Sequence, residues 1–128
     1  MARLNVKRAD DNSEIWSLEV ADSWLKRLVG LIGRTSLETA SGLYFPGTNS
    51  IHMLFMRFAI DVVFVGAPRA DGARPVVAVK PNLKPWIGIV PFVRGGRGAI
   101  ELPAGSLAAS GLRVGDFVTL TAGAAPSA

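Results

Sequence analysis

Glycine and proline recur at short intervals along this chain, and no other feature restricts its fold as strongly. There are 14 glycines and 8 prolines among 128 residues, about 17% where soluble domains average about 12%. Proline ends or kinks a helix and glycine destabilises its interior, so a bundle of long helices is disfavoured. We therefore expect a mainly β domain of short strands joined by turns.

The length fits one globular domain with a sizeable core. A chain of 128 residues is close to the commonest domain size, which disfavours an enzyme with a separate cofactor domain. Hydrophobic residues make up 49% of the chain and charged residues 19%, a composition that excludes a disordered protein. We expect a single β-rich domain over residues 1–121, followed by a frayed C-terminal tail over residues 122–128.

The absence of cysteine and of long apolar runs narrows the classes of function. Without cysteine the chain cannot have a disulfide framework, a cysteine-ligated metal site or a cysteine nucleophile. No apolar run is long enough for a signal peptide or for a membrane-spanning helix. We therefore expect a soluble, cytoplasmic protein without a membrane partner.

Hydrophobic periodicity predicts about seven short strands. Apolar and polar residues alternate at residues 3–8 and 14–20, and the turn-forming residues 10–13 between them predict a hairpin. Residues 60–65 are apolar on both faces of a strand except at Asp61, which is typical of a strand in the middle of a sheet. The other predicted strands are at residues 42–46, 76–79, 98–102 and 116–121.

One segment has helical periodicity instead. Apolar residues recur at three- and four-residue spacing over residues 22–33, which predicts the one solid helix. A single helical turn is predicted at residues 106–110, ended by Gly111. Residues 51–58 fit either type, and residues 81–96, rich in proline and glycine, are predicted to be a long connection. Together these elements predict a β-sandwich-like fold or a partly closed barrel, with α+β character from the helix.

Positive charge is concentrated in the middle of the chain. The net charge is +4, and residues 41–100 hold seven basic residues against two acidic ones. Residues 80–97 contain no acid, and aromatic residues lie among the basic ones: Lys80, Lys84, Trp86, Phe92, Arg94 and Arg97. Such a segment can bind phosphates and stack bases. Most such segments are solvated loops, however, and no nucleic-acid-binding module is visible here, so this partner is disfavoured.

Three ionisable residues stand out within apolar surroundings. His52 is the only histidine, and it is either a hydrogen-bonded structural residue or a general base oriented by Asp61 or Glu101. Asp61 interrupts an apolar strand, where a carboxylate needs hydrogen bonds or a cation such as Arg27 or Arg57. It is therefore a paired structural acid or a site acid. Glu101 alternates with apolar residues, so it either faces solvent or belongs to a site.

Other catalytic and metal-binding patterns are weak. The chain lacks a Gly-x-Ser-x-Gly motif, and the glycine-rich residues 94–98 lack the spacing of a phosphate- or dinucleotide-binding loop. His52, Met53 and Met56 form a soft ligand set for Cu(I), although methionines beside aromatic residues more often fill a core. No cofactor and no metal are therefore expected.

Four blocks of sequence occur in order along the chain. They are Arg-Leu-Val-Gly-Leu-Ile-Gly-Arg at residues 27–34, Gly-Leu-Tyr-Phe at 42–45, Ser-Ile-His-Met-Leu-Phe-Met-Arg-Phe-Ala-Ile-Asp-Val-Val-Phe-Val at 50–65, and Ala-Ile-Glu-Leu-Pro-Ala-Gly at 99–105 with Val-Gly-Asp at 114–116. In this combination the chain resembles the domain of unknown function 192 family over residues 20–120. The resemblance implies a small, β-rich, sandwich-like fold and no established activity.

The resemblance also implies a candidate ligand-binding set. The family pattern includes polar residues at the positions of His52, Arg57, Asp61 and Glu101, with Arg27 in reserve. The set contains arginine but no complete catalytic constellation, so the leading hypothesis is a non-catalytic binding or accessory module that recognises a small anionic ligand or a partner peptide. The alternatives are a hydrolase-type enzyme that uses His52 with Asp61 or Glu101, and nucleic-acid binding through the basic segment.

Overall fold

The computed structural model describes residues 3–20, 41–52 and 58–123, without the side chains of Ser41 and His52. Outside these ranges lie the predicted helix and four residues singled out from the sequence: residues 22–33, Arg27, Met53, Met56 and Arg57.

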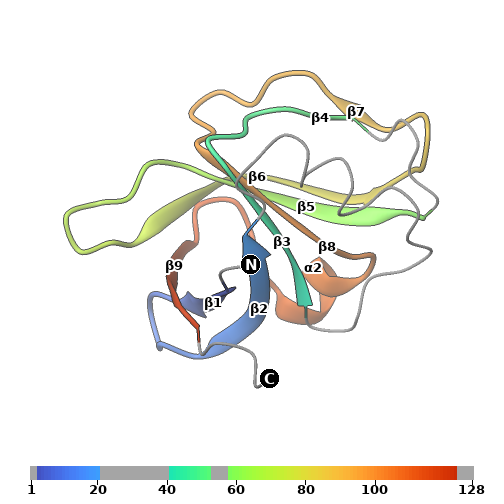
Figure 1. Cartoon of the computed structure of the whole chain (residues 1–128). Helices are drawn as coiled ribbons and strands as arrows, with labels where there is room; N and C mark the ends of the chain where they lie inside the picture. The colour runs from blue at the N-terminus through green and yellow to red at the C-terminus, as the bar shows by residue number, and fades with distance from the viewer. Residues whose placement is uncertain (1–2, 21–40, 53–57, 124–128) are drawn as a thin grey trace.

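Nine strands and one short helix make up the described part of the chain (Figure 1). They are β1 (Arg3–Arg8), β2 (Glu14–Val20), β3 (Ser41–Pro46), β4 (Ile51–His52), β5 (Ile60–Val65), β6 (Arg74–Leu83), β7 (Ile89–Val90), β8 (Gly98–Pro103), α2 (Ser106–Ser110) and β9 (Phe117–Ala122). The predicted fold class, mainly β, is confirmed. The predicted bounds of β1, β2 and β5 match the structure at both ends, and the predicted helical turn is α2. It ends at Gly111, whose φ of 70° is left-handed and suits glycine.

The strand β6 extends beyond its predicted range because β5 pairs with it as far as Leu83, and part of its other edge has no strand partner among the described residues. The prediction stopped before Pro81, whereas the strand continues to Leu83. Of the described strands, β9 pairs only with the first two residues of this edge of β6. Proline has no N–H to donate, which an unpaired edge tolerates. The predicted long connection at residues 81–96 therefore contains the end of β6 and all of β7.

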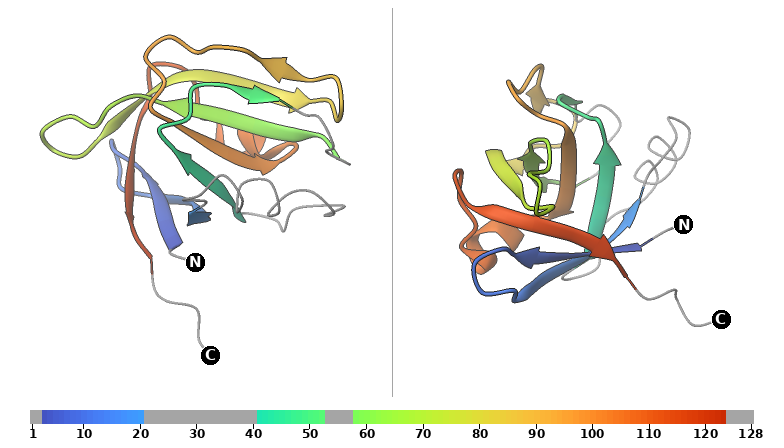
Figure 2. Two further views of the ribbon diagram at one scale, coloured as in Figure 1. Left: turned by 45° about the horizontal axis from the view of Figure 1, so that its top comes forward. Right: turned by 90° about the vertical axis from the view of Figure 1, so that its left-hand side faces the viewer.

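Seven strands form one sheet that closes into a ring, in the order β1-β2-β3-β8-β5-β6-β9. The ring closes because β9 pairs with β1 on one edge and with β6 on the other, and Figure 2 shows β9 beside β1. The predicted hairpin of β1 and β2 is confirmed as an antiparallel pair, whereas β2 and β3 pair in parallel. This closed arrangement is nearer to the predicted partly closed barrel than to a sandwich of two separate sheets. β4 and β7 form a small second sheet.

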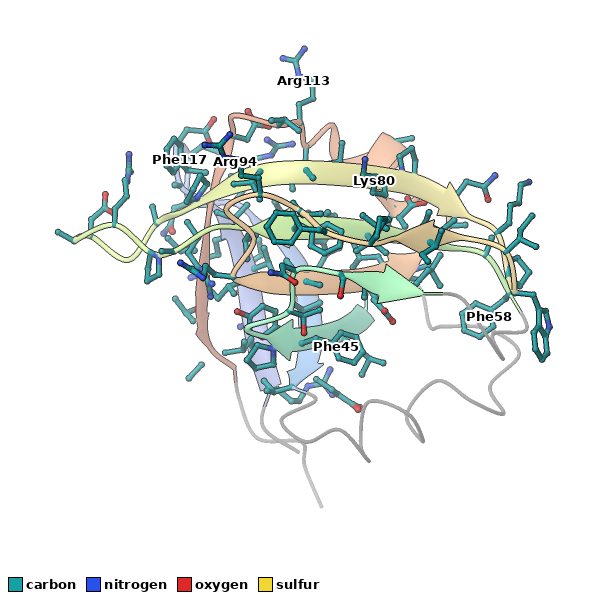
Figure 3. The ribbon with its side chains drawn as sticks, turned by 90° about the horizontal axis from the view of Figure 1, so that it is seen from above. Phe45, Phe58, Lys80, Arg94, Arg113 and Phe117 are labelled. Carbon is teal, nitrogen blue, oxygen red and sulfur yellow. The ribbon has the colours of Figure 1, made fainter. Side chains whose placement is uncertain are left out.

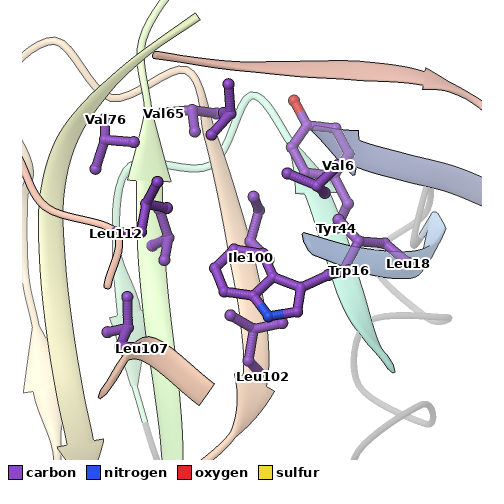
Figure 4. Close-up of a cluster of buried hydrophobic side chains, with 12 residues drawn as sticks. Val6, Trp16, Leu18, Tyr44, Val65, Val76, Ile100, Leu102, Leu107 and Leu112 are labelled. Atoms are coloured by element: carbon purple, nitrogen blue, oxygen red, sulfur yellow. The ribbon is translucent and has the colours of Figure 1, made fainter. Parts of the chain in front are cut away.

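Buried side chains form two clusters, one on each face of the ring. All seven strands and α2 contribute to the inner cluster, which Figure 4 shows: Val6, Trp16, Leu18, Tyr44, Val63, Val65, Val76, Ile100, Leu102, Leu107, Leu112 and Val118. The outer cluster comes from β3, β5, β7 and β8 and the segment after β7: Leu43, Phe45, Ile60, Val62, Phe64, Val90, Val93 and Ala99. Because both faces are covered, all six residues of β5 are buried, as predicted for a strand in the middle of a sheet.

Candidate functional site

Asp61 is buried, and backbone groups satisfy its carboxylate. The residue lies in β5 and is 1% exposed. Its Oδ1 accepts a hydrogen bond from the N–H of Asn82 at 2.8 Å, and its Oδ2 accepts from the N–H groups of Gly105 at 3.0 Å and Leu107 at 2.9 Å. Charge-assisted bonds of this kind offset the cost of burying a carboxylate. Of the two kinds of partner expected for Asp61, the structure shows the hydrogen bonds; Arg27 and Arg57 lie outside the described residues.

Glu101 is also buried, so the alternative that it faces solvent is wrong. It is 4% exposed and lies in the middle of β8, opposite Leu43 of β3 and Val62 of β5. The alternation of apolar and polar residues distinguishes the two faces of a strand, but it does not reveal whether something covers the polar face. Here Val90 of β7 and Val93 belong to the outer cluster and help to cover that face.

The two acids point to opposite faces of the same sheet. Directly opposed residues on neighbouring strands share a face. Asp61 is opposed to Leu102 of the inner cluster, whereas Glu101 is opposed to Val62 of the outer cluster. Although both belong to the candidate set predicted from the sequence, the fold does not bring their side chains together.

Among the described residues, one oxygen of the Glu101 carboxyl group has no partner that would stabilise a charge. Its Oε2 is buried without a hydrogen-bond partner among the described residues. Burial disfavours the ionised form and raises the pKa of Glu101 to about 8. At pH 7 the neutral form of the carboxyl group is therefore favoured over the carboxylate. A neutral carboxyl group both donates and accepts hydrogen bonds, whereas a carboxylate only accepts them.

The neighbouring backbone packs tightly against Glu101. A Cβ atom at Gly42 of β3 would collide with the carbonyl oxygen of Glu101 and would lie 2.9 Å from a side-chain carbon of Leu102. Only glycine allows β3 and β8 to approach so closely.

A buried polar group without a partner costs about 1–3 kcal/mol. Good packing does not require such a group, and perturbed, unsatisfied acids of this kind are concentrated at functional sites.

His52 lies in β4, within the small sheet next to the outer cluster. Its neighbour Ile51 packs against that cluster, so the backbone of His52 and the side chain of Glu101 lie on the same side of the ring. The side chain of His52 and the residues Arg27 and Arg57 lie outside the described part of the chain. Their membership of the site therefore stays a prediction.

Most of the basic segment at residues 80–97 is exposed to solvent, although Val90 and Val93 are buried. Its four basic residues are all exposed, and Figure 3 shows Lys80 of β6 and Arg94 beyond β7 on the side of the molecule that carries β6. Large apolar side chains between them are exposed as well, which the sequence did not predict: Trp86, Ile87, Ile89 and Phe92. A connection rich in proline has no periodicity from which burial can be predicted. The sequence signal that could have indicated this exposure is the occurrence of four large apolar residues within this short basic segment.

A hollow of about 560 Å³ lies between the β1–β2 hairpin and α2. Arg8, Trp16 and Ser106 help to line it, whereas Asp61 and Glu101, the two candidates whose side chains are described, do not. Arg8 donates a hydrogen bond to the carbonyl oxygen of Ser110 and pairs with Asp116 at 3.7 Å. Its charge is therefore already partnered, and the hollow has weaker support as a binding site than the surroundings of Glu101.

Two other kinds of site find no support among the described residues. No three or more His, Asp or Glu side chains of residues 3–20, 41–52 and 58–123 are grouped so that they could hold a metal ion. Within the same ranges, no helix has the length and hydropathy needed to cross a membrane.

Comparisons with known proteins agree with the resemblance noted from the sequence. The model of the DUF192 family, described as "Uncharacterized ACR", matches residues 5–120. A UPF0127 protein of Thermococcus sibiricus is 32% identical over 111 residues, which cover 82% of this chain and 68% of that protein.

Two solved structures share the fold. One, provisionally described as a transcription regulator of Sinorhizobium meliloti, has a TM-score of 0.73 at 21% identity, with 93% of this chain and 92% of that chain covered. The other is a protein of unknown function from Novosphingobium aromaticivorans, with a TM-score of 0.72 at 23% identity and coverage of 91% and 82%. At these identities the likeness concerns the fold alone.

Proposed function

Because the chain belongs to the DUF192 family, whose description names no activity, we propose a function from the geometry of this chain: it is a non-catalytic binding module for a small ligand that carries an oxyanion. The observation that carries the proposal is the buried carboxyl group of Glu101, whose Oε2 has no partner among the described residues. Glu101 forms the base of the site, and the predicted residues His52, Arg57 and Arg27 supply its other polar groups.

The protonation state of Glu101 favours an anion over a cation. In its neutral form the carboxyl group donates an O–H to a carboxylate or phosphate oxygen, and such charge-assisted bonds are short and strong. A cation would need the ionised form, which burial disfavours. The excess of basic residues in the middle of the chain, seven against two over residues 41–100, also supports an anionic ligand.

A ligand panel tests the proposal at pH 7. Thermal unfolding is followed with short mono- and dicarboxylates, inorganic phosphate, sulfate, and a short peptide with a free C-terminal carboxylate beside its C-terminal amide. We expect at least one anion to raise the melting temperature and the amide to have no effect. The panel separates carboxylates from phosphates, and small ligands from a partner peptide.

Substitution of Glu101 connects binding to the site. Glu101→Met removes the O–H donor at similar volume and should weaken binding about tenfold to hundredfold, because a hydrogen bond to a charged group contributes about 1.5–3 kcal/mol. Glu14→Met, at an exposed glutamate, is the matched control and should bind normally. In the native protein the affinity should fall at pH values above about 8, as Glu101 ionises. Unchanged binding in Glu101→Met would refute the proposal.

The second candidate function is a hydrolase that uses His52 as general base. The buried carboxyl group of Glu101 supports this candidate as well. A carboxyl group whose pKa lies near neutrality is suited to general acid–base chemistry. Since the carboxylate of Asp61 already accepts three backbone hydrogen bonds, Glu101 is the better partner for His52. Turnover of ester or amide substrates that both His52→Ala and Glu101→Gln abolish would favour this candidate. Tight binding without turnover would favour the binding module.

Nucleic-acid binding through residues 80–97 stays a prediction. The exposure of all four basic residues in this segment supports it. The aliphatic side chains exposed among them do not, because they neither stack on bases nor contact phosphates favourably.

A further inference from the structure

Exposed apolar side chains are concentrated in one short segment. Of the five large hydrophobic residues exposed in the described part of the chain, four lie within residues 86–92. We name these four residues the apolar rim: Trp86 (53% exposed), Ile87 (77%), Ile89 (66%) and Phe92 (66%). The fifth, Val114, lies elsewhere in the sequence, before β9. Contiguous exposed apolar side chains commonly mark an interaction surface.

A folded backbone holds the apolar rim in place. The N–H of Gly88 donates to the carbonyl oxygen of Lys84 at 3.0 Å, which closes a turn before β7. Within the rim segment Val90 is buried and paired with Ile51 of β4, and Val93 beyond it is buried in the outer cluster. Alternation along β7 then leaves Ile89 outside while Val90 points inward. The exposure of the rim is therefore a product of the fold.

Basic residues flank the apolar rim in the sequence. The exposed residues Lys80 and Lys84 precede it, and the exposed residues Arg94 and Arg97 follow it. The sequence contains no acidic residue between Asp71 and Glu101, and Glu101 itself is buried. In Figure 3, Lys80 and Arg94 lie on the side of the molecule that carries β6. The segment thus combines apolar side chains with a basic border.

We propose that this segment docks the protein on an anionic lipid surface, with Ile87, Ile89 and Phe92 entering the interfacial layer and the basic border contacting lipid headgroups. Apolar and aromatic side chains beside lysine and arginine are the combination that binds membrane interfaces without spanning them. The sequence alone predicted no membrane partner, because the exposure of these side chains is visible only in the fold. The proposal does not depend on the Glu101 site.

Charge and side-chain chemistry disfavour the other occupants. A second copy of the chain would bring two basic borders face to face, and like charges repel. A nucleic acid would satisfy the basic residues but would leave Ile87 and Ile89 against a polar, charged partner. A lipid surface suits both parts of the segment, because its anionic headgroups can contact the basic border and its apolar acyl region can contact the apolar rim.

Sedimentation with lipid vesicles tests the proposal on the full chain. Vesicles of phosphatidylglycerol mixed with phosphatidylcholine are compared with vesicles of phosphatidylcholine alone, at low and at high salt. We expect binding to the anionic vesicles at low salt, at least about tenfold weaker binding to the neutral ones, and loss of binding at high salt.

Substitutions of exposed residues assign the binding to this segment without disturbing the core. Ile87→Ser combined with Ile89→Ser should weaken binding at least about tenfold, whereas Val114→Ser removes an exposed apolar group elsewhere and should have no effect. Lys84→Glu should weaken binding about tenfold, and Arg113→Glu is its matched charge reversal. Arg113 is exposed and projects from another edge of the molecule (Figure 3).

The remaining outcomes overturn the proposal. One is the absence of binding to anionic vesicles at low salt, and another is binding that the rim and Lys84 variants leave unchanged. Concentration-dependent dimerisation that Ile87→Ser abolishes, without vesicle binding, would assign the segment to a second copy. Salt-dependent retardation of a nucleic acid that Lys84→Glu abolishes, without vesicle binding, would assign it to nucleic acid.

Discussion

Asp61 and Glu101 are buried acids on adjacent strands, yet their surroundings differ in the property that matters for function. Asp61 faces the inner cluster and accepts three backbone hydrogen bonds. Glu101 faces the outer cluster, and its Oε2 has no partner among the described residues. A satisfied acid is part of the scaffold, whereas an unsatisfied one needs another explanation, such as a ligand. Burial alone therefore does not distinguish a structural acid from a site acid.

The backbone near each acid explains the difference. Asp61 lies where α2 begins and β6 ends, and at such places N–H groups are not used by strand pairing or by the helix. Glu101 lies in the middle of β8, between two paired strands, where the sheet itself uses the neighbouring N–H groups. Asp61 thus finds donors close by, whereas Oε2 of Glu101 finds none among the described residues.

The largest expected effect comes from removing the satisfied acid. Asp61→Ala leaves three buried N–H groups without an acceptor, so we expect the free energy of unfolding to fall by about 3–5 kcal/mol. Urea unfolding at pH 7 measures this change. A loss below about 1 kcal/mol, close to that of an ordinary surface substitution, would mean that the three hydrogen bonds of Asp61 contribute little to stability.

Removing the unsatisfied acid should have the opposite sign. Glu101→Met replaces a buried polar group without a partner by an apolar one of similar length, so we expect stabilisation by about 1–3 kcal/mol at pH 8. Glu14→Met at an exposed position should change stability by less than about 0.5 kcal/mol. Destabilisation by Glu101→Met would indicate that the carboxyl group has a stabilising partner in the folded protein.

The pH dependence of stability sharpens the same comparison. The pKa of Glu101 is raised from 4.5 to about 8 in the folded protein, so between these values the folded state holds more of this proton than the unfolded state. The contribution of Glu101 protonation to the free energy of unfolding is therefore fully present below pH 4.5 and is lost as the pH rises to about 8. Between these pH values the free energy of unfolding should fall by at most about 1.4 kcal/mol per pH unit. Urea unfolding across this range should show the slope in the native protein and not in Glu101→Met.

The smallest expected effect concerns one of the donors to Asp61. Asn82 donates its N–H from a left-handed conformation with a φ of 53°, which most side chains adopt at a cost. Asn82→Ala should therefore lower the free energy of unfolding by about 1 kcal/mol. Asn82→Gly keeps the N–H donor, and glycine adopts the left-handed conformation readily. Its free energy of unfolding should therefore differ from that of the native protein by about 0.5 kcal/mol or less. Equal losses in the two variants would assign the effect to the asparagine side chain.

Local sequence patterns predicted elements well where a segment's own residues decide its structure. The strands β1, β2 and β5 and the turn α2 with Gly111 follow from periodicity and from the conformational freedom of glycine. The predicted range of β6 was too short. A strand tolerates proline at an edge without a pairing partner, and only the tertiary structure shows that Pro81 lies in such a strand. The candidate set named both Asp61 and Glu101, but their separation on two faces depends on the register between β5 and β8.

By itself, the sequence determined the mainly β class, most strand positions, the family and the identity of the two unusual acids. Those properties rest on side-chain alternation, turn residues and local motifs, all of which act over a few neighbouring positions. Only the tertiary structure decided that the strands close into a ring and that Glu101 is covered while Trp86, Ile87, Ile89 and Phe92 are exposed. It also decided that backbone donors reach the carboxylate of Asp61 but, among the described residues, not Oε2 of Glu101. Solvent exposure and hydrogen-bond satisfaction depend on segments distant along the chain, and no local pattern contains that information.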